Sequence, residues 1–116
     1  MSPELIAHFR DPKNVGELPP PAVTVQVENP ICGDILRLSA VFEGGRVIDV
    51  RYKVRGCTAS IAAGSALTEL ILTSPLPSIT KEAVEDAVGG LSNESKHAAV
   101  LCVDAVRALI TEARCF

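Results

Sequence analysis

Apolar residues recur at every second position in the first half of the chain. The segments 22–29, 34–42 and 46–54 alternate apolar with polar residues, a period typical of half-buried β-strands. Gly44-Gly45 separates the second and third segments, and two adjacent glycines predict the tight turn of an antiparallel hairpin. The side chains expected to face a core are Val23, Val25, Val27, Leu38, Ala40, Phe42, Ile48, Val50, Tyr52 and Val54, together with either Ile35 or Leu36.

Helix-forming residues dominate the second half of the chain. The segments 58–74, 79–90 and 95–113 have helical composition; prolines part the first two, and a glycine pair parts the last two. A short helix is also expected to open at Ser2, ahead of the proline-rich stretch "GELPPP". Strands followed by helices predict an α+β fold in which a small three-stranded antiparallel sheet is covered by helices.

Composition adds a size and a cellular setting to this picture. A length of 116 residues fits one domain spanning 1–116, and 47% hydrophobic residues with only 3% aromatic residues predict a core of Val, Ile, Leu and Ala. The net charge is −3 with scattered basic residues, so neither nucleic acid nor an anionic membrane is an expected partner. No stretch approaches the ~20 apolar residues of a membrane span. We therefore expect a soluble, cytoplasmic protein with its four cysteines reduced.

Two short motifs place thiols at the ends of predicted strands. In "NPICGD", Gly33 permits a sharp turn that directs Cys32 and Asp34 to one point; the alternative is a simple turn with a buried thiol and a solvated carboxylate. In "RGCTAS", Cys57 lies where a strand ends and a helix begins, with Thr58 or Ser60 available to cap that helix. The positive end of a helix stabilises a thiolate there, and the alternative is a structural cysteine at a tight corner.

Chain topology is expected to bring these motifs together. The predicted hairpin returns the chain to its starting end, so Cys32 and Cys57 should lie side by side. His97 follows the loop "GGLSNES" at the start of the last predicted helix, where an imidazole can face outward. A lone histidine at such an edge is more often a surface or capping residue.

Four segments together resemble a known family. "HFRDPKNVGELP", "CGD", "GCTASIAAGSALTEL" and "KHAAVLCVDAVRA", in that order and at those spacings, are similar to the IscU/SufU/NifU N-terminal family of iron-sulfur cluster assembly scaffolds. The likeness covers nearly the whole chain. It implies a SufE/NifU-like (IscU-like) fold with an exposed metal or cluster site on loops at one end.

The resemblance also implies a ligand set, with one departure. Cys32, Asp34 and Cys57 match ligand or near-ligand positions of the family, and His97 matches the family histidine. The family's third cysteine directly follows that histidine, where this chain has Ala98.

Two further cysteines are candidates to replace the missing thiol. Cys102 lies four residues after Ala98, hence ~6 Å further along nearly the same helix face. We expect Cys102 to be buried beside the site without binding metal; the alternative is that it is a metal ligand or a sulfur acceptor. Cys115, near the end of the chain, is expected to be a free surface thiol, with a substitute sulfur-acceptor role as its alternative.

Two functions follow from these residues. The first is a non-enzymatic scaffold that transiently holds a [2Fe–2S] cluster bound through Cys32 and Cys57, takes sulfur from a cysteine desulfurase and passes the cluster to apo iron-sulfur proteins, as a monomer or weak homodimer. The second is a zinc- or iron-binding, sulfur-accepting relative that assembles no cluster. Thiolate, imidazole and carboxylate ligands suit either metal, so the sequence leaves both open.

Overall fold

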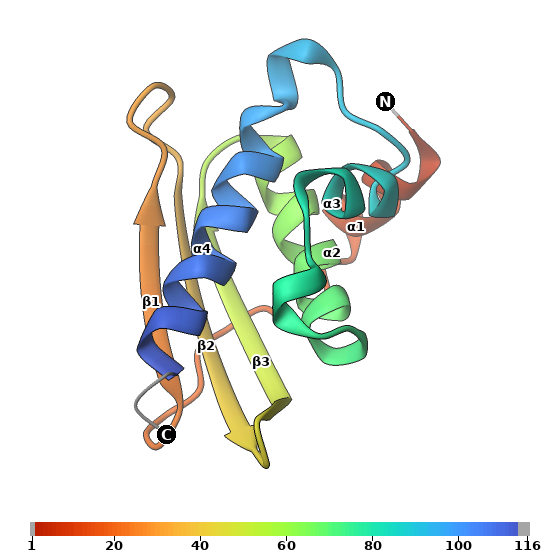
Figure 1. Ribbon diagram of the computed structural model, residues 1–116. Coiled ribbons are helices and arrows are strands. Elements are labelled where there is room, and N and C mark those ends of the chain that lie inside the picture. Colours follow the sequence, from red (N-terminus) through yellow and green to blue (C-terminus); the bar gives the residue numbers. More distant parts are fainter. Residues whose placement is uncertain (1, 114–116) are drawn as a thin grey trace.

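A computed structural model describes residues 2–113 of the chain (Figure 1). Within that range, no helix is long and apolar enough to cross a membrane. The elements in chain order are α1 (Pro3–Arg10), β1 (Val23–Glu28), β2 (Ile35–Glu43), β3 (Arg46–Arg55), α2 (Thr58–Thr73), the 3-10 turn η1 (Leu76–Ser78), α3 (Lys81–Ala87), the 3-10 turn η2 (Asn93–Ser95) and α4 (His97–Ala113).

The strands form one antiparallel sheet in the order β1-β2-β3. Val27 pairs with Leu36 across the first ladder, and Ile35 pairs with Arg55 across the second. The hairpin between β2 and β3 turns at Gly44 and Gly45, which both have positive φ. The predicted α+β fold with a three-stranded antiparallel sheet is therefore confirmed.

A β-bulge changes which side chain of β3 enters the core. Val41 pairs with Asp49 but Phe42 pairs with Val47, so the strand holds one extra residue at Ile48. The expectation that Ile48 faces inward is wrong: its side chain is 51% exposed, and Val47 is buried instead. The alternation resumes after the bulge, and Val50 and Tyr52 are buried as predicted.

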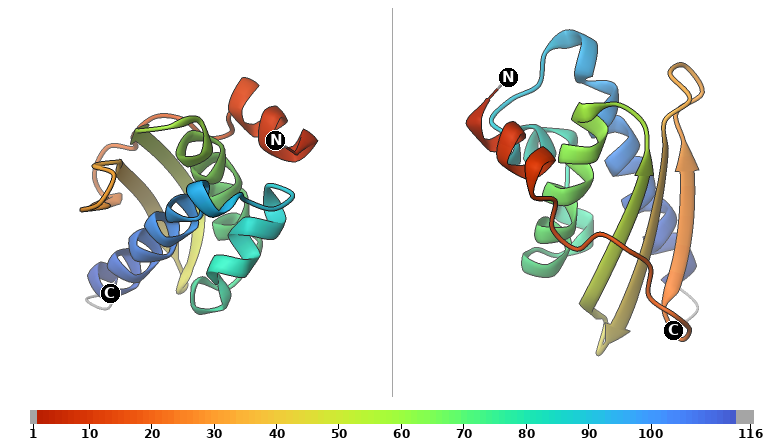
Figure 2. Two further views of the ribbon diagram at one scale, coloured as in Figure 1. Left: turned by 90° about the horizontal axis from the view of Figure 1, so that it is seen from above. Right: turned by 180° about the vertical axis from the view of Figure 1, so that it is seen from behind.

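Helices α2 and α4 cover one face of the sheet, with α1 and α3 packed outside them (Figures 1 and 2). Helix α2 contacts β3 on one side and α1 and α3 on others, so it is buried on several faces. Small residues make this close packing possible. Ala63 and Gly64 face the sheet side, where the Tyr52 hydroxyl donates a 2.8 Å hydrogen bond to the Ile61 carbonyl.

The N-terminal segment is fastened to α2 by buried hydroxyl groups. The Ser65 Oγ atom lies 2.7 Å from His8 Nδ1 and accepts a 2.8 Å hydrogen bond from the Lys13 amide. Asn14 Nδ2 donates to Thr68 Oγ1 at 3.0 Å. His8 and Asn14 of "HFRDPKN" therefore stabilise the fold.

The linker that follows crosses the sheet face opposite the helices (Figure 2, right). Its Leu18 amide donates a 2.8 Å hydrogen bond to Ser39 Oγ, and Glu17 pairs with Arg37 at 2.7 Å. Both contacts hold the linker against β2. The linker thereby leads to the start of β1, at the end of the sheet opposite the β1–β2 loop.

Candidate functional site

Three segments distant in sequence meet at one end of the molecule. Figure 1 shows the loop between β1 and β2, the start of α2 and the start of α4 at the same end. The pairing of Ile35 with Arg55 explains the first two, because it aligns the start of β2 with the end of β3. Helix α4 begins at His97, as the sequence predicted, and brings the imidazole to this end.

Three of the predicted site residues form a group suited to a metal ion. One ligand atom each from Cys32, Asp34 and His97 lies within 4.8 Å of the others, and this is the one such group of three or more among the described residues. Gly33, with φ of 76°, makes the turn that directs Cys32 and Asp34 to the same side. The proposed convergence of thiol and carboxylate is present in the structure.

Cys57 adjoins this group through the histidine. Its Sγ lies 3.5 Å from His97 Nε2, and its side chain is exposed, as is that of Cys32. Cys57 is itself the N-cap residue of α2 and makes no side-chain capping hydrogen bond. The expectation that Thr58 or Ser60 caps this helix is therefore wrong, and the cap position leaves the Cys57 thiol available.

His97 is held in one orientation by a backbone carbonyl. Its Nδ1 lies 3.0 Å from the Glu94 carbonyl oxygen, and because a carbonyl can only accept, Nδ1 carries a proton. In the neutral ring, Nε2 then has a free lone pair. This lone pair faces Cys57 Sγ and Asp34 Oδ2, each at 3.5 Å. The imidazole is thus arranged as a metal ligand or as a proton acceptor for the thiol.

Asp34 is a buried carboxylate held by several donors. Its residue is 7% exposed, and its Oδ2 accepts hydrogen bonds from Ser60 Oγ at 2.6 Å and from the Cys57 amide at 3.4 Å. Burial disfavours the charge, but the bonds from Ser60 and Cys57, with attraction to His97 when its ring is protonated, outweigh it and hold the pKa of Asp34 below its usual value. Asp34 is therefore an anion at neutral pH.

Two residues that contact Asp34 carry no sequence signal for a role at the site. The sequence suggests Ser60 only as a helix cap, yet its buried hydroxyl donates a hydrogen bond to the carboxylate. A Cβ at Gly56 would lie 2.6 Å from Asp34 Cγ, so only glycine leaves room there. The "GC" dipeptide pointed to Cys57, but no pattern in one sequence indicates that its glycine serves a carboxylate 22 positions earlier.

Cys102 lies in the core and not at the opening. It is 1% exposed, and burial raises the pKa of its thiol to about 12. Ala98, at the family's third cysteine position, is also buried, and Leu101, Ala105 and Leu109 form the inward row of α4. The expected burial of Cys102 is confirmed. Cys115 lies outside the described residues.

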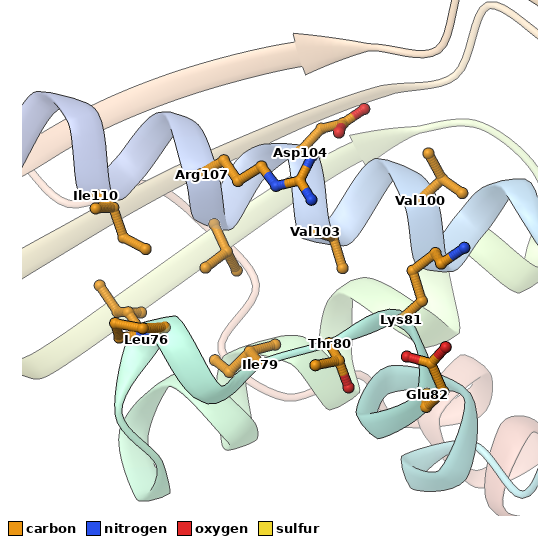
Figure 3. A pocket seen from close by; sticks show the side chains of 12 residues that line it. Leu76, Ile79, Thr80, Lys81, Glu82, Val100, Val103, Asp104, Arg107 and Ile110 are labelled. Atoms are coloured by element: carbon orange, nitrogen blue, oxygen red, sulfur yellow. The ribbon is translucent and has the colours of Figure 1, made fainter.

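Two hollows on the surface differ in what lines them. A groove of about 500 Å³ lies between two walls (Figure 3). One wall is formed by η1 and the start of α3, and the other by the middle of α4. Its apolar floor includes Ile79 and Val103, its rim carries Lys81 and Arg107, and no cysteine or histidine lines it. A smaller hollow of about 320 Å³ opens beside Cys57, with Leu5, Leu91 and Ser95 among its lining residues.

Comparison with known proteins shows the family of this chain. Residues 1–114 match the NifU-like N terminal domain. The chain belongs to this family. It is 32% identical over 114 residues to the iron-sulfur cluster assembly scaffold protein IscU 1 of Archaeoglobus fulgidus, covering 96% of this chain and 74% of that protein. It is 30% identical to the scaffold protein IscU of Aquifex aeolicus, covering 94% of this chain and 73% of that protein.

Solved structures share the fold of this NifU-like domain. A nitrogen-fixing NifU-like protein (N-terminal) from Brucella abortus superposes with a TM-score of 0.60 at 18% identity, covering 94% of this chain and 78% of that one. A putative iron-sulfur cluster assembly scaffold protein for the SUF system from Fervidobacterium islandicum has a TM-score of 0.59 at 21% identity, covering 95% and 84%. At these identities the likeness concerns the fold alone.

Proposed function

We propose that this NifU-like domain is an iron-sulfur cluster assembly scaffold whose cargo is held by Cys32, Asp34, Cys57 and His97. The observation that carries the proposal is the meeting of these four side chains at one exposed end of the molecule. A [2Fe–2S] cluster takes four protein ligands, and histidine replaces cysteine in some natural examples. The number and the chemistry of the four side chains therefore suit such a cargo.

The four ligands favour release of a bound cluster over its permanent retention. Soft thiolates suit iron-sulfide cores, whereas the Asp34 carboxylate is a hard ligand that binds them less well. Cys32 and Cys57 are both exposed, so an acceptor protein can approach the two thiolates directly. A cargo bound by two thiolates, one imidazole and one carboxylate is expected to be labile, as transfer to apo-proteins requires.

The exposed thiols are the ones that can accept sulfur. Cys102 is buried with a thiol pKa of about 12, so Cys32 and Cys57 are the described thiols open to a sulfur donor. For Cys57, the thiol proton moves to His97 Nε2 and the thiolate attacks the outer sulfur of a persulfide on a cysteine desulfurase. The donor's S–S bond breaks, its cysteine leaves as a thiolate, and a persulfide forms on Cys57. The hollow beside Cys57 offers space for that approach.

A second function is favoured by the missing third thiol. Ala98 and the buried Cys102 leave two exposed thiols among the described residues, so the group also suits a single tetrahedral zinc or iron ion. A protein of this kind would carry one metal ion per chain and take up no sulfide.

Ala98→Cys restores the family's third thiol. If the domain is a scaffold, we expect this substitution to lengthen the lifetime of a bound cluster.

Cluster transfer tests the scaffold function. The protein is incubated without oxygen with ferrous iron, cysteine and a cysteine desulfurase, freed of small molecules, and mixed with an apo-ferredoxin. We expect visible cluster absorption on the NifU-like domain first, and then the spectrum of the holo-ferredoxin at its expense. A domain that retains one zinc ion and never delivers a cluster would support the second function instead.

A further inference from the structure

Ser60 occupies a position between the two parts of the site. It is the third residue of α2 and is 2% exposed. Its Oγ lies 2.6 Å from Asp34 Oδ2 and 3.5 Å from Cys57 Sγ. The Ser60 hydroxyl donates its single hydrogen to the Asp34 carboxylate. Toward Cys57, the same oxygen can offer only a lone pair.

The oxygen that Ser60 holds is the one turned toward the histidine. Asp34 Oδ2 accepts the Ser60 hydroxyl and the Cys57 amide, and it lies 3.5 Å from His97 Nε2. The carboxylate also packs against Gly56, where a Cβ would lie 2.7 Å from the same Oδ2 atom. The Ser60 bond is the shortest of these contacts and comes from a buried helix residue. Rotation of the carboxylate away from His97 would break it.

We propose that Ser60 is a positioning residue that holds the Asp34 carboxylate toward His97 and thereby sets how Asp34 engages the metal of the cargo. This rests on the proposed function for the identity of the cargo, but not for the presence of a metal site. Partners behind metal ligands orient them, and their loss typically costs about 10- to 100-fold in metal affinity. Ser60 does not itself touch the metal; it acts through Asp34.

Cobalt(II) binding to the purified domain tests the role of Ser60 without any cluster chemistry. The d–d absorption of Co²⁺ reports its ligands, and a titration gives its dissociation constant. Ser60→Ala should weaken Co²⁺ binding about 10-fold or more and change the d–d bands toward those of Asp34→Ala. Ser60→Thr, which keeps the hydroxyl, should remain within about threefold of the parent. Ser92→Ala, which removes an exposed hydroxyl from a neighbouring loop, should change neither readout.

A double-mutant cycle separates positioning from a general structural effect. If Ser60 acts through Asp34, then Ser60→Ala added to Asp34→Ala should change Co²⁺ affinity less than about twofold. A full additional loss in that background would overturn the proposal, as would an unchanged spectrum and affinity in Ser60→Ala alone. Should Ser60→Ala fail to fold, Ser60→Val, which has the shape of threonine without its hydroxyl, carries the same expectations.

The outcome is distinguishable from failure of the scaffold function. A parent protein that binds Co²⁺ with the expected Ser60 dependence, yet never assembles a cluster, would refute the scaffold and leave the role of Ser60 in place. A parent protein that binds no Co²⁺ at Cys32, Asp34 and His97 would overturn the positioning role itself.

Discussion

Cys57 and Cys102 have opposite surroundings. Cys57 is exposed at the start of α2, with its Sγ 3.5 Å from His97 Nε2. Cys102 is buried on the inward row of α4, and burial raises the pKa of its thiol to about 12. A protonated thiol is a poor ligand and a poor nucleophile, because both tasks need the thiolate. Environment, and not residue type, separates their roles.

Replacement of Cys102 should affect stability but not metal binding. Cys102→Ala removes one buried sulfur, and we expect the free energy of unfolding to fall by about 1 kcal/mol. Metal content after loading should equal that of the parent, measured by elemental analysis. Loss of metal from a variant that remains folded by circular dichroism would make Cys102 a ligand.

Alkaline pH should destabilise the fold through two buried acids. Burial, with a smaller contribution from Cys102, raises the pKa of Tyr52 to about 12, and burial raises that of Cys102 likewise. Both pKa values are higher in the folded state, so their stabilising effect is complete below about pH 9 and is lost as pH rises toward 12. Tyr52 is the only tyrosine, so absorbance near 295 nm follows it alone.

The tyrosine titration has a definite expected result. The native protein should ionise Tyr52 near pH 12, and the urea-unfolded protein near its ordinary value of about 10. Tyr52→Phe should lose less stability than the parent between pH 9 and 12. A native midpoint near 10 with the fold intact would show that the phenol is not buried as described.

At the scale of elements, periodicity predicted each strand and long helix to within a few residues. It failed at Ile48, because the bulge opposite Val41 and Phe42 inserts one residue and inverts the alternation. A bulge is set by how two strands pair, which a pattern along one strand does not contain. The predicted N-cap of α2, Thr58 or Ser60, is also wrong, because the helix already includes Thr58 and the Ser60 hydroxyl donates to Asp34.

A methyl group added at Gly64 of helix α2 should destabilise the fold. A Cβ there would lie 2.5 Å from Tyr52 Cε2, so the tyrosine ring must move. Alanine is favoured over glycine in a helix by about 1 kcal/mol, but overpacking costs about 1–3 kcal/mol. We therefore expect Gly64→Ala to lower the free energy of unfolding by up to about 2 kcal/mol in urea titrations.

The same substitution in a Tyr52→Leu variant tests whether the Tyr52 ring causes the loss of stability. In Tyr52→Leu, where the ring is absent, Gly64→Ala should be neutral or stabilising by up to about 1 kcal/mol. The same loss in both backgrounds would place the clash elsewhere along α2.

At the scale of the whole molecule, the site lies at one end of a core built elsewhere. Cys32 and Cys57 are exposed at the ends of elements, whereas the buried side chains lie between the sheet on one side and helices α2 and α4 on the other. The sequence predicted Cys32, Asp34 and Cys57 as candidates because each belongs to a short motif at the end of an element, and His97 because it matches the family histidine. Ser60 and Gly56 were beyond prediction as parts of the site because their roles depend on contacts between distant segments.

Iron and acid-labile sulfide bound per chain test the central claim most directly. After anaerobic reconstitution with a cysteine desulfurase, the parent should contain iron and sulfide in equal amounts, whereas Cys32→Ser and Cys57→Ser should contain neither and remain folded. Cys102→Ala serves as the matched thiol control and should resemble the parent. Iron or zinc bound without sulfide in the parent, or an undiminished cluster in Cys57→Ser, would contradict the account.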